Sequence, residues 1–252
     1  MYLDVIELRD FYASFLGQLV PRLVGQAIGE LVSVGPADRV LGLGFATPYL
    51  APLAADAERA LAFMPAQQGV IDWPPEGRSA TALVEEDSLP LADASIDVVL
   101  LVHALEMSPR PRELLEEVRR VLTAAGRLVV VVPNRQGAWA RSDISPFGHG
   151  RPYLRGQLRA QFADAGFEAK AWATALHMPP LAGPSLQRLA ALLERIGRVG
   201  WPAFSGVICA LATKRTVQVA RLRPRRSLAP ALRPALPAAG GGMARRARPP
   251  IR

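Results

Sequence analysis

Two short apolar runs, with an amphipathic segment between them, constrain the fold of this chain most strongly. The runs are 97–102 (Asp-Val-Val-Leu-Leu-Val) and 128–132 (Leu-Val-Val-Val-Val), and apolar residues at helical spacing cover 110–122. A glycine turn at Gly126 precedes the second run, which Pro133-Asn134 stops. A continuous apolar run bounded by turn residues suits a strand buried on both faces, and strand–helix–strand of this length suits a right-handed parallel crossover. A parallel sheet is therefore predicted.

Further apolar runs alternate with helical patterns along the rest of the chain. We expect five more strands, at 40–43, 60–64, 81–84, 168–173 and 206–212. We expect further helices at 49–57, 154–165 and 186–200. The first 35 residues also have apolar side chains at helical spacing, until Gly35-Pro36 stops the pattern. Strands alternating with helices predict an α/β doubly wound sheet with additional N-terminal helices.

The segment 85–134 resembles the class I S-adenosylmethionine (SAM)-dependent methyltransferases, in particular the small-molecule type. The shared features are an acid and Leu-Pro before a short loop, an Asp-Val-Val strand, His-x-Leu-Glu at 103–106, Arg-Val-Leu at 120–122, and a Gly-x-Leu strand that ends in Pro-Asn. The resemblance covers about residues 36–215. It implies a Rossmann-like, mostly parallel sheet of seven strands, the last antiparallel, with helices on both faces.

The resemblance also implies a cofactor loop after the first strand, and here the sequence departs from the family pattern. The family has an acid two residues before the first glycine of Gly-x-Gly-x-Gly. This chain has Gly42 at the acid, Gly44 at the first glycine, Ala46 at the second and Pro48 at the third. Glycines serve there because the backbone turns tightly and lets the cofactor approach. By alignment Gly42, Gly44 and Ala46 border SAM, although Gly44 alone fits any strand-to-helix turn.

Three further positions border the cofactor in proteins of this family. At the end of the second strand, where an acid usually holds the ribose, this chain has Phe63-Met64-Pro65. Glu85 aligns with the acid that contacts the adenine amino group, and its alternative role is a solvated acidic turn. His103 aligns with the turn that lines the methionine portion. It is a candidate general base near neutral pH, and a packed or capping histidine is the alternative. Glu106 is expected on a solvated helix face.

The loop at 135–152 is the second site prediction. It combines aromatic, acidic and basic side chains with three glycines and contains no long apolar run. Loops of this length over the carboxyl end of a strand often act as lids or specificity elements. We therefore predict substrate contacts from Asn134, Asp143, His149 and Arg151, with His149 a second candidate catalytic residue. Hydrogen bonds that only fix the loop are the alternative.

The basic charge of the chain is concentrated in a C-terminal tail. The net charge is +8, and residues 217–252 contain nine arginines without an acid, which leaves −1 for the first 216 residues. The tail also holds six prolines and Gly240-Gly241-Gly242. Such a composition predicts a disordered extension, with an arm for nucleic acid or another anionic surface as the alternative. The expected organisation is a helical segment at 1–35, an α/β domain at 36–216 and the tail at 217–252.

Cysteine, histidine and hydropathy patterns exclude several other classes. Cys209 is the single cysteine and lies in an apolar run, so no disulfide framework is expected and Cys209 is interpreted as a core residue. The three histidines are widely spaced, so no metal site is predicted. No apolar stretch reaches the roughly 18 to 20 residues that span a bilayer. The early acids of the N-terminus do not fit a signal peptide, so a cytoplasmic protein is expected.

Three functional hypotheses follow. The first is a cytoplasmic methyltransferase that transfers the methyl group of SAM to a small-molecule acceptor, mainly by positioning the reactants. The second is a methyltransferase-like domain that has lost catalysis and serves as a binding or regulatory module, because two loop glycines and the ribose acid are missing. The third is a methyltransferase recruited to RNA or a membrane by its basic tail.

Overall fold

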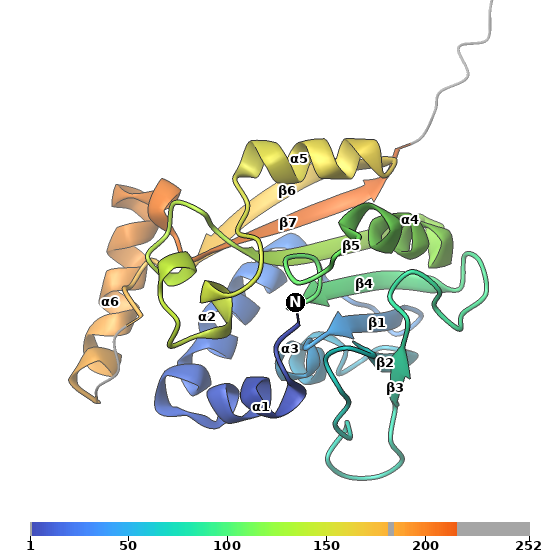
Figure 1. Cartoon of the computed structure of the whole chain (residues 1–252), viewed down its shortest axis with the longest axis horizontal. Coiled ribbons are helices and arrows are strands. Elements are labelled where there is room, and N and C mark those ends of the chain that lie inside the picture. Colours follow the sequence, from blue (N-terminus) through green and yellow to red (C-terminus); the bar gives the residue numbers. More distant parts are fainter. Residues whose placement is uncertain (1, 181–183, 216–252) are drawn as a thin grey trace, which may run out of the picture. The chain divides into compact units, whose positions relative to one another are not determined.

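The computed structural model describes residues 2–180 and 184–215, which form a seven-stranded sheet with flanking helices (Figure 1). The strands are β1 (Arg39–Gly44), β2 (Arg59–Pro65), β3 (Thr81–Val84), β4 (Ile96–Val102), β5 (Leu122–Pro133), β6 (Phe167–Ala175) and β7 (Val207–Lys214). Their order in the sheet is β3-β2-β1-β4-β5-β7-β6. Strand β7 is antiparallel to both β5 and β6, and the other neighbouring strands are parallel to each other. The predicted doubly wound, mostly parallel sheet is confirmed. The predicted tail, 217–252, lies outside the described residues.

Helices cover both faces of the sheet. They are α1 (Val5–Ala13), α2 (Phe15–Leu31), α3 (Thr47–Leu53), α4 (Pro111–Val121), α5 (Arg155–Asp164) and α6 (Pro184–Gly200), with short 3₁₀ helices η1 (Trp139–Arg141), η2 (Pro146–Gly148) and η3 (Pro202–Phe204). Helices α4 and α5 share one hydrophobic core with the sheet, and α2 and α3 share the other (Figure 1). The predicted segment 1–35 thus contains α1 and α2.

The two cores arise from alternation along the buried strands. Leu41 and Leu43 of β1 face α4 and α5, whereas Val40 faces α2 and α3. Successive side chains of a strand point to opposite faces, so a strand covered on both sides must be apolar throughout. Each such side chain contributes roughly 1.5–3 kcal/mol when fully buried. This requirement explains why the uninterrupted apolar runs predicted the central strands.

Two element boundaries differ from the sequence prediction by more than two residues. Helix α3 ends at Leu53 instead of residue 57. Pro52 in its last turn has no backbone N–H, so the helix lacks one of its internal hydrogen bonds near this end. Strand β5 begins at Leu122, six residues early. Its pairing with β4 jumps from Ile96↔Leu122 to Val98↔Arg127, so residues 123–126 bulge out at the place where a turn was predicted.

The corner between α1 and α2 directs the N-terminal segment over the carboxyl edge of the sheet. Ser14 ends α1 and also begins α2, where its Oγ accepts a hydrogen bond from the backbone N–H of Gly17 at 3.1 Å. A Cβ on Gly17 would lie 1.8 Å from the carbonyl oxygen of Phe11, so only glycine allows this close turn. At the other end, Asp4 caps α1 by accepting from the N–H of Ile6 at 2.7 Å.

Candidate active site

The loop after β1 is pressed against the end of β4. Gly44 has a φ of +87°, and a Cβ at this position would lie 2.2 Å from the carbonyl oxygen of Val102. The next residue, Phe45, donates its backbone N–H to the same oxygen at 2.8 Å. Gly44 is therefore required for the turn itself, because an L side chain would be strained and would also collide with β4.

Gly42, at the position where the family has an acid, has a packing role. A Cβ on Gly42 would lie 2.7 Å from Cδ1 of Leu50 and 2.8 Å from Cβ of Ala46. Helix α3 thus packs directly on β1, and the site has no room for a carboxylate side chain. Ala46 is itself buried beneath α3.

The ends of β2 and β3 carry one exposed acid and one buried acid. Glu85 is exposed and pairs with Ser88 in an isolated β-bridge. Glu86 is buried and accepts hydrogen bonds from Oγ of Ser108, at 2.6 Å, and from the hydroxyl of Tyr2. Burial raises the pKa of Glu86 above its usual value, an effect that the Ser108 hydrogen bond partly offsets. At the end of β2, Met64 is fully buried.

His103 lies at the carboxyl end of β4 in a backbone conformation that is unusual for a non-glycine residue. Its φ is +51°, and its side chain is fully buried. Nδ1 lies 3.2 Å from Oε1 of Glu106, and Nε2 lies 2.9 Å from the hydroxyl of Tyr12. Such strained positions persist only where the surrounding structure holds them, and they cluster at functional sites.

The hydrogen bonds of His103 form a chain with a defined direction. An ionised carboxylate only accepts, so Nδ1 of His103 carries the hydrogen and Nε2 accepts from Tyr12. The hydroxyl of Tyr12 then accepts from that of Tyr49, which lies 2.9 Å away. Burial raises the pKa of Tyr12 well above its usual value, so the phenol remains a donor at ordinary pH. The Tyr49–Tyr12–His103–Glu106 chain thus ends on a carboxylate at the carboxyl edge.

The N-terminal segment fills the space in front of this edge. The ring of Tyr12 stacks on Phe45, with centroids 5.4 Å apart and planes 21° apart. Val5 and Leu8 of α1 form a separate buried cluster with Phe45 and Met64. We call residues 2–13 the N-terminal latch.

Backbone and side-chain bonds hold the latch at its start. Val5 donates its N–H to the carbonyl oxygen of Gln68 at 2.7 Å, and Nε2 of Gln68 donates to the carbonyl oxygen of His103 at 3.2 Å. The hollow bounded by Tyr2, Pro65 and Glu85 holds only about 10 Å³. A hollow of that size holds about one water molecule at most, so this end of the edge is closed to a cofactor as well.

Unsatisfied polar atoms gather around His103. Among the described residues, four buried side-chain atoms lack a hydrogen-bond partner, namely Oε1 of Gln68, Oε2 of Glu106, Oγ of Ser145 and the hydroxyl of Tyr153. Gln68 and Glu106 bond directly to His103. Burial, and to a smaller extent the charge of Glu106, raises the pKa of Tyr153 to about 12. Each unsatisfied buried group costs about 1–3 kcal/mol. With the latch in place, several buried polar atoms near His103 therefore lack hydrogen bonds.

The loop after β5 brings some of the predicted substrate residues to the same edge. The ring of Phe147 lies 4.7 Å from that of His103. Asp143 and His149 line a cavity of about 330 Å³, whose other wall includes Glu7 and Phe11 of the latch. Arg151 donates its backbone N–H to the carbonyl oxygen of Glu106 at 2.7 Å, and the residue is exposed.

Asn134 does not join this group. Its Nδ2 donates to the carbonyl oxygen of Ala203, at 2.8 Å, and to Oγ of Ser205, while its Oδ1 accepts from the N–H of Gln136. The side chain is buried and uses its amide to fix the start of the loop. The hydrogen bonds of Asn134 therefore fix the loop, which was the alternative to the predicted substrate contact.

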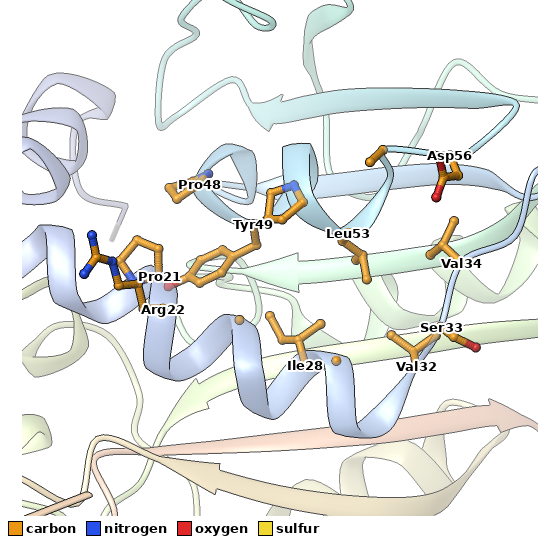
Figure 2. Close-up of a pocket in the computed structure, with 14 residues that line it drawn as sticks. Pro21, Arg22, Ile28, Val32, Ser33, Val34, Pro48, Tyr49, Leu53 and Asp56 are labelled. Carbon is orange, nitrogen blue, oxygen red and sulfur yellow. The ribbon is translucent and has the colours of Figure 1, made fainter. Parts of the chain in front are cut away.

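A larger cavity lies on the flank of the domain. About 550 Å³ is enclosed between α2, with Pro21, Arg22 and Ile28, and α3, with Tyr49 and Leu53 (Figure 2). The ring of Tyr49 lines this cavity, and its hydroxyl belongs to the Tyr12–His103 chain. None of the residues predicted as the site lines this cavity, which meets the polar edge only through Tyr49.

Sequence reasoning missed two parts of the site. The expectation that Glu106 lies on a solvated helix face is wrong, because Glu106 is 2 % exposed and bonded to His103. The available signal was that Glu106 follows His103 by three residues, directly after a buried strand. The role of Tyr12 carried no local signal, because its partner His103 is 91 residues away.

The comparisons with known proteins identify the fold family. Residues 42–130 match the family model of a methyltransferase domain. The chain has the fold of the class I methyltransferases. Two probable S-adenosylmethionine-dependent methyltransferases, from two strains of Mycobacterium tuberculosis, are each 37 % identical over 95 residues, which is 37 % of this chain and 34 % of theirs. The chain thus spans about a third of the length of these curated relatives.

Solved structures support the same fold for this methyltransferase domain. A SAM-dependent methyltransferase of Thermotoga maritima matches with a TM-score of 0.53 at 18 % identity, covering 84 % of this chain and 96 % of that one. A SAM-dependent methyltransferase of Archaeoglobus fulgidus also has a TM-score of 0.53 at 18 % identity, over 81 % and 98 %. At such identities the likeness concerns the fold alone.

Residues 2–180 and 184–215 show neither a metal-ligand cluster nor a membrane-spanning helix. This part of the chain holds no group of three or more His, Cys, Asp or Glu side chains placed to bind a metal ion. None of its helices combines the length and the apolarity that crossing a bilayer requires. Cys209 is buried in β7, where desolvation raises its pKa to about 12.

Proposed function

We propose that this chain is a SAM-dependent methyltransferase acting on a small-molecule acceptor. The observation that carries the proposal is the buried His103–Glu106 pair, with unsatisfied oxygens around it, at the carboxyl edge where β1 and β4 are neighbours. Ligands of open α/β sheets bind at this edge, at the point where the strand order reverses. The match to a methyltransferase domain over 42–130 and the SAM-dependent naming of the mycobacterial relatives support the same chemistry.

The residues present fit SAM in part. The tight turn at Gly44 stands where the family has its cofactor loop. The exposed Glu85 stands where the family contacts the adenine, and the His103 turn stands where the family lines the methionine portion of the cofactor. No carboxylate stands at the end of β2 to hold the ribose, and a charged hydrogen bond of that kind contributes about 1.5–3 kcal/mol. We therefore expect SAM to bind more weakly than in relatives that keep the acid. When bound, SAM supplies an activated methyl group.

The N-terminal latch must move before the cofactor can enter. Tyr12, Leu8 and Tyr2 occupy the edge from the His103 end to the Glu85 end. We propose that the latch exchanges between this closed arrangement and an open one, and that the cofactor binds the open one. The apparent affinity is then reduced by the fraction of open molecules.

His103 has the position and hydrogen bonding of a general base. Glu106 holds the hydrogen on Nδ1, which leaves the lone pair of Nε2 directed toward Tyr12. Once Tyr12 withdraws, Nε2 can take a proton from the acceptor atom that is methylated. Asp143, His149 and Arg151 would then contact the acceptor from the loop after β5.

A calorimetric titration with S-adenosylhomocysteine, the demethylated product of SAM, tests the proposal. Ligand at about 100 times its dissociation constant should stabilise the fold by roughly 2.7 kcal/mol. Glu85→Ala should weaken binding severalfold, whereas Glu113→Ala, which removes an exposed glutamate on α4, should not. Absence of binding at millimolar ligand, in the full chain and in variants that open the latch, would refute the proposal. The hypothesis of a domain that has lost catalysis finds no support in the comparisons.

A further inference from the structure

Helix α6 lies beside the β6 end of the sheet (Figure 1). Together with η3 it presents an exposed apolar surface. Leu192, Ile196 and Val199 are 51 %, 46 % and 86 % exposed, and their spacing places them on one stripe of the helix. Trp201 and Phe204, which are 40 % and 60 % exposed, continue the surface into η3. We call these five residues the apolar ridge. Adjacent exposed apolar residues of this size mark interaction sites more often than singly exposed ones do.

The opposite side of α6 is fixed to the domain, so the helix cannot turn the ridge inward. The buried carboxylate of Glu194 accepts from the N–H of Leu176 at 2.9 Å, from the N–H of His177 at 2.7 Å and from Nδ1 of His177 at 3.0 Å. A Cβ on Gly197 would lie 2.4 Å from Cβ of His177, which shows how closely the helix packs there.

The exposed charged residues within 192–204 are basic. Arg195 is exposed beside Ile196, and Arg198 is partly exposed and pairs with Glu30 at 2.8 Å. Glu194 is the single acid between residues 192 and 204, and its carboxylate is buried against His177. The surface thus combines exposed aliphatic and aromatic side chains with arginine and presents no acid of its own segment.

We propose that the apolar ridge docks on an anionic lipid membrane. Helices that lie in a membrane interface combine leucine, phenylalanine or tryptophan on one face with arginine beside it. The nine arginines of residues 217–252 favour an anionic surface, each basic residue near such a surface adding roughly fivefold to the affinity. Arg195 itself disfavours a second copy of the chain, because a symmetric pair would bring it near its own copy.

Flotation of the full chain with lipid vesicles tests this proposal independently of SAM. We expect binding to vesicles of equal parts phosphatidylglycerol and phosphatidylcholine, much weaker binding to phosphatidylcholine alone, and loss of binding as salt is raised. Brominated lipids should quench Trp201, an effect that disappears in Trp201→Phe. Vesicle binding without any dependence on phosphatidylglycerol would overturn the proposal.

The decisive comparison is between two valine-to-aspartate variants with the same change in charge. Val199→Asp should weaken vesicle binding at least tenfold, because it removes an inserted apolar side chain. Val70→Asp, at a valine 44 % exposed in the loop between β2 and β3, should change it less than twofold. Equal loss in both variants would reduce the effect to net charge and overturn the proposal. So would a wild-type dimer that Val199→Asp dissociates while vesicle binding is unaffected.

Discussion

Replacing Tyr12 with phenylalanine should tighten the binding of S-adenosylhomocysteine. The change keeps the ring that stacks on Phe45 and removes the hydroxyl, which bonds to Tyr49 and to Nε2 of His103 at 2.9 Å each. Both partners would then remain buried without their hydrogen bond in the closed arrangement. In the open arrangement they face water or ligand, so the loss falls on the closed arrangement alone.

The expected size follows from the two hydrogen bonds. Each contributes about 1 kcal/mol net, so the closed arrangement loses about 2 kcal/mol. If the closed arrangement dominates by more than that, the apparent dissociation constant should fall roughly 30-fold. The same loss should lower the melting temperature of the ligand-free protein by about 4–8 °C for a domain of this size. Weaker stability together with tighter binding is the signature of a latch.

Tyr153→Phe is the matched control, because it removes a buried hydroxyl that has no hydrogen-bond partner among the described residues. Calorimetric titration of the three proteins should give equal affinities for wild type and Tyr153→Phe. If Tyr12→Phe binds S-adenosylhomocysteine no more tightly than wild type does, the latch does not compete with the cofactor. If none of the three binds it, the proposed function itself fails.

Three further changes test other parts of the structure. Gly44→Ala should lower the free energy of unfolding by about 3 kcal/mol, from a positive φ and the collision with Val102, and an unchanged thermal melt would contradict this. Because the pKa of Glu86 is raised in the folded protein, Glu86 contributes to the stability of the fold below its usual pKa of 4.5. This contribution is lost as the pH rises through the raised pKa. The melting temperature of wild type relative to Glu86→Gln should therefore fall between pH 4 and pH 7, and a rise would show that the hydrogen bonds outweigh burial. Glu194→Ala should cost about 3 kcal/mol in chemical unfolding, because it leaves buried donors of the Leu176–His177 segment unpaired, whereas exposed Glu168→Ala should cost almost nothing.

The sheet was predictable because its central strands are buried on both faces. Apolar runs such as 97–102 and 128–132 have no polar face to expose, so length and turn residues alone identified them as strands. The antiparallel β7 came from the resemblance to a family, and the order of the strands was not predicted, since strand pairing depends on contacts distant in sequence. Boundaries failed where local chemistry intervened, at Pro52 in α3 and at the bulge of residues 123–126.

The candidate site was predictable only in part, for a related reason. The position of His103 after a buried strand placed it at the carboxyl edge, and its burial could not be inferred from its neighbours in sequence. A helical pattern shows that α1 has an apolar face without showing which surface that face covers. The role of Asn134 depended on Ser205, which is 71 residues away, and an exposed glycine-rich loop resembles both a substrate loop and a structural one.

The latch and the degenerate cofactor loop have a common physical explanation. With Gly42 packed beneath α3 and Met64 at the end of β2, the edge is more apolar than a site built around carboxylates. An apolar edge attracts the apolar face of α1, which buries Val5 and Leu8 against Phe45 and Met64. The polar atoms of Gln68 and Glu106 oppose this closure because they remain unsatisfied beneath it. Closure is thus favoured by apolar burial and opposed by buried polar groups, and such opposing terms of a few kcal/mol allow a ligand to shift the balance.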